Sequence, residues 1–247
     1  MVGIIDQTNR GMGRNVAYVQ KMAAQAGVEI THATGYYKEP FLPPECYTLT
    51  EQQLCDIMVK ELTEGMEGTG VRATVIGEIG TSKDITETEA KVFRAASRAH
   101  AETGAPICTH TTLGTRGLEQ LEIFKSFGVD LSRVVLSHID LSADLDYMKR
   151  LLDQGVNIAF DTIGKCNYQP DVSRADWLSR LCAEGYDTQI VMSMDITRRS
   201  NFADRGGVGY SYLLDTFAPL ASEAGVPDRA WENLLYRNAL RIYKGQK

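Results

Sequence analysis

Short apolar runs rich in β-branched residues alternate along the chain with longer segments of helical periodicity. Seven of these runs have the length and composition of buried strands. They are Val2–Thr8, Glu29–Gly35, Arg72–Gly80, Pro106–Thr111, Val134–Asp140, Asn157–Gly164 and Gln189–Asp195. Because strands that alternate with helices form parallel sheets, the pattern predicts an α/β fold.

The intervening segments carry apolar stripes at helical spacing. The stripe after Thr50 consists of Leu54, Ile57, Met58 and Leu62, and similar stripes follow Gly114 and Ser142. Thr86 and Glu89 form a capping-box pattern, which marks the start of a helix. No linker interrupts the alternation, so the sequence predicts one domain over residues 1–247.

Composition and charge limit the classes of partner and the cellular compartment that we expect. The 247 residues carry a net charge of −6, and acids and bases are spread along the chain. This disfavours nucleic acid and anionic membranes as partners, because both require a clustered positive field. There is no apolar run of the ~20 residues that a membrane span needs, and no signal peptide is apparent. Five cysteines without CxxC spacing predict reduced thiols and a cytoplasmic protein.

Five consecutive predicted strands carry an ionisable residue at or near their C-terminal end. These residues are Glu78, His110, His138, Asp161 and Asp195. If their side chains face the interior of a barrel, they converge at its C-terminal mouth, where barrel enzymes keep their active sites. Strand alternation places Glu78 on the face of Ile76 and Asp195 on the face of Ser193.

Carboxylate and imidazole donors together suit Zn²⁺ or Mn²⁺. We therefore predict that Glu78, His110, His138 and Asp195 are metal ligands. The alternative for each residue is a polar strand end that is hydrogen-bonded to a loop. Asp161 is assigned this structural role, because its Phe-Asp-Thr setting suggests no partner.

Several segments resemble the phosphotriesterase-related family of the amidohydrolase superfamily, and in particular the phosphotriesterase homology proteins of bacteria. They are residues 6–14, 33–37, 75–81, 109–111, 136–138, 160–165 and 194–199. The resemblance runs from Met1 to the C-terminal helix. It implies a TIM (β/α)8-type barrel with a binuclear zinc centre, two metal ions in a complete site.

The resemblance also implies a role for each predicted ligand. Glu78 corresponds to the residue that bridges the two metals, and His110 and His138 to ligands of one metal. Asp195 corresponds to a ligand of the other metal and to the catalytic group that accepts a proton from the bridging hydroxide. The implied activity is metal-hydroxide attack on an ester or lactone.

The sequence departs from the family pattern at one point. The family carries a His-x-His pair on its first barrel strand, and this chain has no such pair. Seven predicted strands and the missing pair together indicate that the first strand is absent, a deficit of about 40 residues. One metal ion would then be retained, by Glu78, His110 and His138. Mn²⁺ and Fe²⁺ stay open as alternatives to Zn²⁺.

Cationic and phenolic residues in the predicted C-terminal loops suggest a small-molecule substrate that is negatively charged. They are Tyr36, Tyr37, Lys165, Arg198 and Arg199, with Arg14 nearby. A cationic cluster in an acidic protein focuses anions, so we expect an ester or lactone with a carboxylate or phosphate group. The alternative is that the arginines pair with Asp140, Asp161 or Asp204 and only brace the loops.

The sequence thus predicts a lactonase-like, metal-dependent hydrolase. The competing interpretation is a catalytically crippled, truncated barrel that serves as a non-enzymatic protein or is completed by a partner. An open barrel would expose strand edges, so association into a homo-oligomer stays open.

Overall fold

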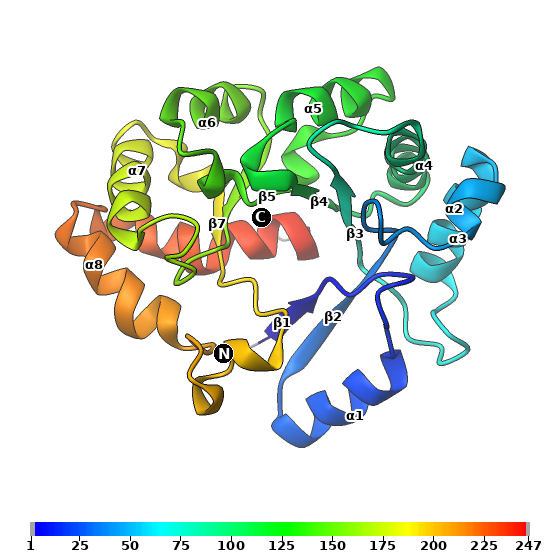
Figure 1. Cartoon of the computed structure of the whole chain (residues 1–247), viewed down its shortest axis with the longest axis horizontal. Coiled ribbons are helices and arrows are strands. Elements are labelled where there is room, and N and C mark those ends of the chain that lie inside the picture. Colours follow the sequence, from blue (N-terminus) through cyan, green and yellow to red (C-terminus); the bar gives the residue numbers. More distant parts are fainter. Residues whose placement is uncertain (1–2, 246–247) are drawn as a thin grey trace. The chain divides into compact units, whose positions relative to one another are not determined.

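The computed structural model describes residues 3–245, in two compact units (Figure 1). Unit 1 comprises residues 3–112 and 116–134, and unit 2 comprises residues 113–115 and 135–245. Each unit is compact by itself, and the single domain expected from the sequence stays a prediction.

Unit 1 contains four parallel strands that alternate with helices (Figure 1). The strands are β1 (Gly3–Asp6), β2 (Glu29–Thr34), β3 (Val75–Thr81) and β4 (Ile107–Thr111). The helices are α1 (Val16–Ala26), α2 (Glu45–Thr48), α3 (Glu51–Thr63), α4 (Glu87–Thr103) and α5 (Gly117–Ser126). The strands pair in chain order, β1 with β2, β2 with β3, and β3 with β4.

Capping boxes start two of the helices in unit 1. The hydroxyl of Thr86 accepts from the backbone N–H of Glu89, and the Glu89 carboxylate accepts from the N–H of Thr86, which confirms the predicted capping box. Thr50 and Gln53 form a second box at the start of α3. Helices α3 and α4 pack against each other. Phe93 of α4 also stacks on Phe124 of α5, with ring centroids 5.3 Å apart.

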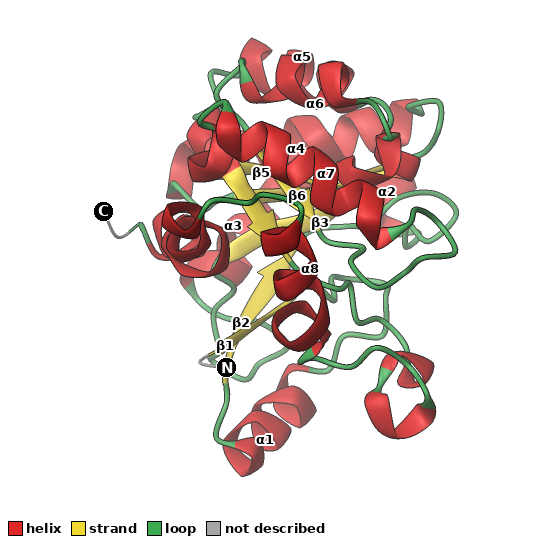
Figure 2. Ribbon diagram, turned by 90° about the vertical axis from the view of Figure 1, so that its left-hand side faces the viewer, coloured by secondary structure: helices red, strands yellow, loops and turns green. Residues whose placement is uncertain are grey.

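Unit 2 contains three parallel strands, paired in chain order, with helices between and after them (Figure 2). The strands are β5 (Val134–Ser137), β6 (Asn157–Phe160) and β7 (Ile190–Met192). The helices are α6 (Leu145–Leu152), α7 (Asp171–Ala183) and α8 (Ala218–Glu223). Short π-helical segments lie before α8, at Leu213–Phe217, and after it, at Asn233–Arg237 and Leu240–Lys244. Helix α7 packs against α8.

All seven predicted strands are present, and the α/β class is confirmed. Val2, at the start of the first prediction, lies outside the described residues. The predicted C-terminal ends of β5, β6 and β7 were wrong by three or four residues. At two of these ends the backbone leaves the extended region, since φ is 63° at His138 and 45° at Asp195.

The absence of a first barrel strand, and closure as a barrel, stay predictions. Between residues 3 and 245, none of the helices combines the length and the apolar character required to cross a membrane.

Candidate metal centre

The four predicted ligands divide equally between the two units. Glu78 and His110 belong to unit 1, and His138 and Asp195 belong to unit 2. Each pair is therefore described within its own unit.

Glu78 lies in the middle of β3, at an irregularity of the sheet. Strand β3 pairs with β4 through Ile76 and again through Ile79, and the register shifts between these two positions. Gly77 has a φ of 141°, and a Cβ atom there would lie 2.1 Å from the carbonyl oxygen of Cys108, so only glycine fits. This bulge breaks the strict alternation of side chains on which the predicted orientation of Glu78 was based.

His110 lies near the end of β4 and is held by a phenol. The hydroxyl of Tyr37 is 2.9 Å from its Nδ1, and the Tyr37 ring packs edge-on against the imidazole. The Glu78 Oε1 atom is 3.9 Å from the same nitrogen. The two predicted ligands of unit 1 thus lie side by side, and both are partly buried.

The buried amide of Gln120 fixes the strand ends around His110. Its Nε2 donates to the backbone oxygen of His110 at 2.9 Å and to the hydroxyl of Thr81 at 2.8 Å. Its Oε1 accepts from Thr109 at 2.6 Å. This amide joins β3 to β4 just where the two ligands project, and the sequence alone did not single it out.

His138 is the first residue after β5, and the carboxylate of Asp161 holds it at two points. Asp161 Oδ1 lies 2.9 Å from the ring Nδ1 and accepts from the backbone N–H of His138 at 2.8 Å. The sequence suggested no partner for Asp161, and the structure gives it one, His138. The pairing of β5 with β6 accounts for the contact. Leu136 pairs with Ile158, and His138 and Asp161 each follow the last residue of their strand directly.

Asp195 is the third residue beyond β7, and its carboxylate forms an ion pair with Lys165. The strand-face argument for Asp195 was wrong, because the residue lies outside the strand with a positive φ. Lys165, predicted to bind substrate, contacts a predicted ligand in this structure, and its role in substrate binding stays a prediction.

An arginine inside unit 2 supports the loops that carry these groups. Arg174 is fully buried and donates to Asp140 at 2.7 Å and to Asp171 at 2.8 Å. Burial, and then the negative charge of Asp161, raise the pKa of Asp140 although Arg174 and Thr162 act to lower it.

The predicted substrate-binding residues differ in their exposure. Tyr36 is fully buried, and burial raises the pKa of its phenol. Arg14, only 4% exposed, pairs with Glu61 and Glu67. Neither side chain is open to a ligand in this structure. Arg198 and Arg199 are exposed, and Tyr37 contacts His110 as described above.

The predicted bracing partners of the arginines are engaged elsewhere in unit 2. Asp140 pairs with Arg174, Asp161 contacts His138, and Asp204 pairs with Arg205 at 3.3 Å. The bracing alternative is therefore not supported for Arg198 or Arg199 among residues 3–245.

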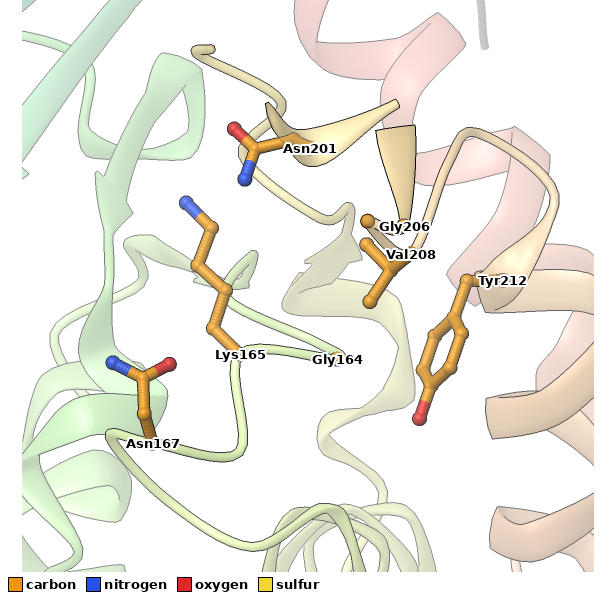
Figure 3. A pocket seen from close by; sticks show the side chains of 8 residues that line it. Gly164, Lys165, Asn167, Asn201, Gly206, Val208 and Tyr212 are labelled. Atoms are coloured by element: carbon orange, nitrogen blue, oxygen red, sulfur yellow. The ribbon is translucent and has the colours of Figure 1, made fainter. Parts of the chain in front are cut away.

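Unit 2 also contains a cavity of about 440 Å³ (Figure 3). It is lined by Gly164, Lys165, Asn167, Asn201, Gly206, Gly207, Val208 and Tyr212. Its walls are the loop between β6 and α7 and the long segment after β7. Figure 3 shows the Lys165 side chain extending toward Asn201, with Tyr212 beyond Val208 on the other side. One cationic and two amide side chains give the cavity the character of a site for a polar or anionic group.

Comparison with known proteins identifies the class. The model of the phosphotriesterase family matches residues 1–243, so the chain belongs to this family. The chain is 42% identical over 242 residues to the phosphotriesterase homology protein of Escherichia coli, covering 98% of this chain and 83% of that protein. A crystal structure of that protein, complexed with phosphate in its active site, superimposes with a TM-score of 0.95.

Two further relatives show the range of the family. The N-acetyltaurine hydrolase of Danio rerio is 31% identical, covering 96% of this chain and 72% of that protein. The structure of a lactonase from Listeria monocytogenes is 29% identical with a TM-score of 0.92, covering 100% of this chain and 82% of that one. The fold is that of phosphotriesterase-family structures, and these relatives are hydrolases.

Proposed function

We propose that this protein is a metal-dependent hydrolase that cleaves esters or lactones bearing a negatively charged group. The observation that carries the proposal is the contact of Asp161 with Nδ1 of His138. A metal-binding histidine in proteins characteristically donates its other ring N–H to a carboxylate, which fixes the ring and its tautomer. Membership in a family of hydrolases supports the same conclusion.

The proposed ligands of one metal ion are Glu78, His110 and His138. One carboxylate and two imidazoles fit Zn²⁺, and Mn²⁺ or Fe²⁺ accept the same donors. With Nδ1 of His138 engaged by Asp161, Nε2 is the nitrogen assigned to the metal. Asp195 is assigned to a second metal position. Metal analysis tests separately whether that position binds an ion.

A bound divalent cation supplies hydroxide at neutral pH by lowering the pKa of coordinated water to ~7. The carboxylates of this chain have the remaining roles. Asp195 would accept the proton that the nucleophile loses, and Lys165 pairs with its carboxylate. Glu78 would be a metal ligand, and the family resemblance implies that it would serve both metal positions.

Lys165, Arg198 and Arg199 are assigned to the negatively charged end of the substrate. Lys165 lines the cavity of unit 2, and the two arginines are exposed in the segment that forms one of its walls. Tyr37 lies beside His110 and is assigned a place near the scissile bond. Tyr36 is left out of the proposal because it is buried.

A second candidate reaction is hydrolysis of an amide. The N-acetyltaurine hydrolases among the relatives favour it, since N-acetyltaurine is an amide with a sulfonate group. Both reactions share a carbonyl carbon attacked by hydroxide and an anionic end to the substrate. The comparisons do not favour the non-enzymatic alternative.

The test is a matched panel of lactones and N-acyl amides, each with and without a terminal carboxylate, phosphate or sulfonate. Metal-loaded protein is expected to hydrolyse anionic members best, and chelation is expected to abolish activity until zinc or manganese is restored. Arg198→Met should raise KM for anionic members only. Arg205→Met, which alters an exposed arginine of the same segment that is paired with Asp204, is the control. Failure of metal-loaded protein to hydrolyse any member contradicts the proposal.

A further inference from the structure

Residues from both walls of the unit 2 cavity contact the carboxylate of Asp171. Asp171, the first residue of α7, is buried. The backbone N–H of Gly164 lies 3.1 Å from its Oδ1 and 3.2 Å from its Oδ2, so both oxygens share this donor. The hydroxyl of Tyr212 donates to Oδ2 at 3.0 Å. Gly164 and Tyr212 line opposite walls of the cavity (Figure 3).

A buried arginine in turn holds the Asp171 carboxylate in place. Arg174, which is fully buried, donates from Nη1 to Asp171 Oδ1 at 2.8 Å. The same guanidinium donates to the hydroxyl of Thr162 at 2.8 Å and to Asp140 at 2.7 Å. Asp171 is therefore a buried acceptor paired with a guanidinium in a low-dielectric setting, where hydrogen bonds are electrostatically stronger than in water. Burial and the bond to Asp171 raise the pKa of Tyr212 to about 12, so its hydroxyl remains a donor at neutral pH.

Packing brings the two walls together at the same place. Gly164 has a φ of 85°, and a Cβ atom there would lie 2.8 Å from Cγ1 of Val208 and 3.1 Å from the Tyr212 ring. Only glycine permits this approach without displacing the facing wall. The hydrogen bonds of Asp171 and the close contact at Gly164 thus act on the same pair of segments.

We propose that Asp171 is a positioning residue for substrate recognition, which bridges the β6–α7 loop to the segment after β7 and so sets the width of the cavity. The inference rests on the proposed function, because it assigns the cavity to the anionic end of the substrate. A fixed width preorganises Lys165 and the two asparagine side chains for a compact polar group. Loss of the bridge therefore affects substrate binding more than the chemical step.

The test compares Tyr212→Phe with Tyr186→Phe. The first variant keeps the ring and removes one donor to Asp171. The second removes an equivalent bond, from the Tyr186 hydroxyl to Asp153 at 2.7 Å, at an exposed site of the same unit away from the cavity. We expect Tyr212→Phe to speed amide hydrogen exchange in residues 162–168 by about fivefold, as loss of one hydrogen bond implies. Tyr186→Phe should leave that segment unchanged.

The kinetic readout uses whichever anionic substrate the panel identifies. Tyr212→Phe is expected to raise KM by about fivefold to tenfold, with kcat and metal content little changed. Unchanged exchange in residues 162–168, or a fall in kcat without a rise in KM, overturns the inference. A wild-type protein without hydrolytic activity contradicts the proposed function instead, and hydrogen exchange then decides on the bridge alone.

Discussion

Each unit buries a carboxylate against arginine, but the two carboxylates differ in their charge environment. In unit 1, Glu61 accepts hydrogen bonds from Arg14, Arg10 and Thr34. Burial alone raises the pKa of Glu61, but these partners outweigh it and hold the pKa below its usual value. Two arginines contact this side chain, and each of them also pairs with a second glutamate, Arg10 with Glu45 and Arg14 with Glu67.

In unit 2, Asp140 shares its one arginine with Asp171, and Asp161 lies close enough to repel it. Burial and this repulsion raise the pKa of Asp140. Within the described part of unit 2, Asp140, Asp161 and Asp171 are all buried, and the buried Arg174 pairs with two of them, Asp140 and Asp171. The comparison teaches that the buried carboxylate of unit 1 has two arginine partners and a lowered pKa, whereas that of unit 2 shares one arginine and has a raised pKa. The negative excess around Asp140 suits an added cation.

The largest effect is expected from Arg174→Met, which leaves Asp140 and Asp171 buried without their cation. The free energy of unfolding should fall by about 3–5 kcal/mol, because removing one partner of a buried pair strands the other. Urea denaturation measures it. Arg180→Met, which breaks an exposed pair with Asp176 on the same helix, is the control and should cost at most about 0.5 kcal/mol. Equal losses in the two variants contradict this account of unit 2.

A smaller effect that depends on pH is expected from Glu61→Gln in unit 1. The variant should lose about 2–3 kcal/mol of unfolding free energy at pH 7, since it removes an ionised acceptor from two arginines. Because the pKa of folded Glu61 is lowered, its contribution is complete above the ordinary value of 4.5 and disappears as the pH falls through the folded value.

The measurement is urea unfolding of wild type and Glu61→Gln at several pH values. Their difference should shrink below pH 4.5. Glu64→Gln, at an exposed pair with Lys60, serves as the control and should show no such dependence. A difference in unfolding free energy that grows as the pH falls would contradict a lowered pKa for Glu61.

Asp161→Ala tests how His138 is held. It removes the acceptor for both the ring and the backbone N–H, so metal affinity should fall by about 10–100-fold. Competition with a chelator of known affinity measures the loss. Asp153→Ala, which removes an exposed aspartate of the same unit, should leave affinity unchanged. An affinity equal to that of wild type would show that Asp161 does not orient a ligand.

The smallest effect is expected from Tyr37→Phe, the equivalent change at His110. Tyr37 is a neutral partner, so loss of its hydrogen bond should weaken metal binding by less than about tenfold. The ring contact with His110 is retained in this variant. The same chelator competition applies, and a loss larger than that of Asp161→Ala reverses the proposed difference between the two units.

Much of the fold follows from the sequence, because hydrophobic periodicity and caps are local. The seven strands and the Thr86–Glu89 capping box were predicted in this way. The strand ends were not, because apolar residues continue past the last paired position of β5, β6 and β7. The positive φ values of His138 and Asp195 arise from loop packing, which local pattern does not encode.

The candidate site was predicted in its ionisable residues but not in the contacts that hold them. Asp161 was set aside because a partner 23 positions away in the chain leaves no local signal. The available clue was that the adjacent strands β5 and β6 are each followed directly by an ionisable residue, His138 and Asp161. Gln120 and Asp171 lie on helices, where a polar residue gives no sign of which strand or loop it meets.

The most direct measurement is elemental analysis of the purified chain beside Glu78→Gln and His138→Ala, after incubation with zinc and removal of the excess. The account predicts about one firmly bound equivalent of zinc in the wild type, as one site of three ligands requires. Both variants should lose it while remaining folded by circular dichroism. A wild type that binds no zinc, or variants that retain the wild-type content, would contradict the assignment of Glu78, His110 and His138 as metal ligands.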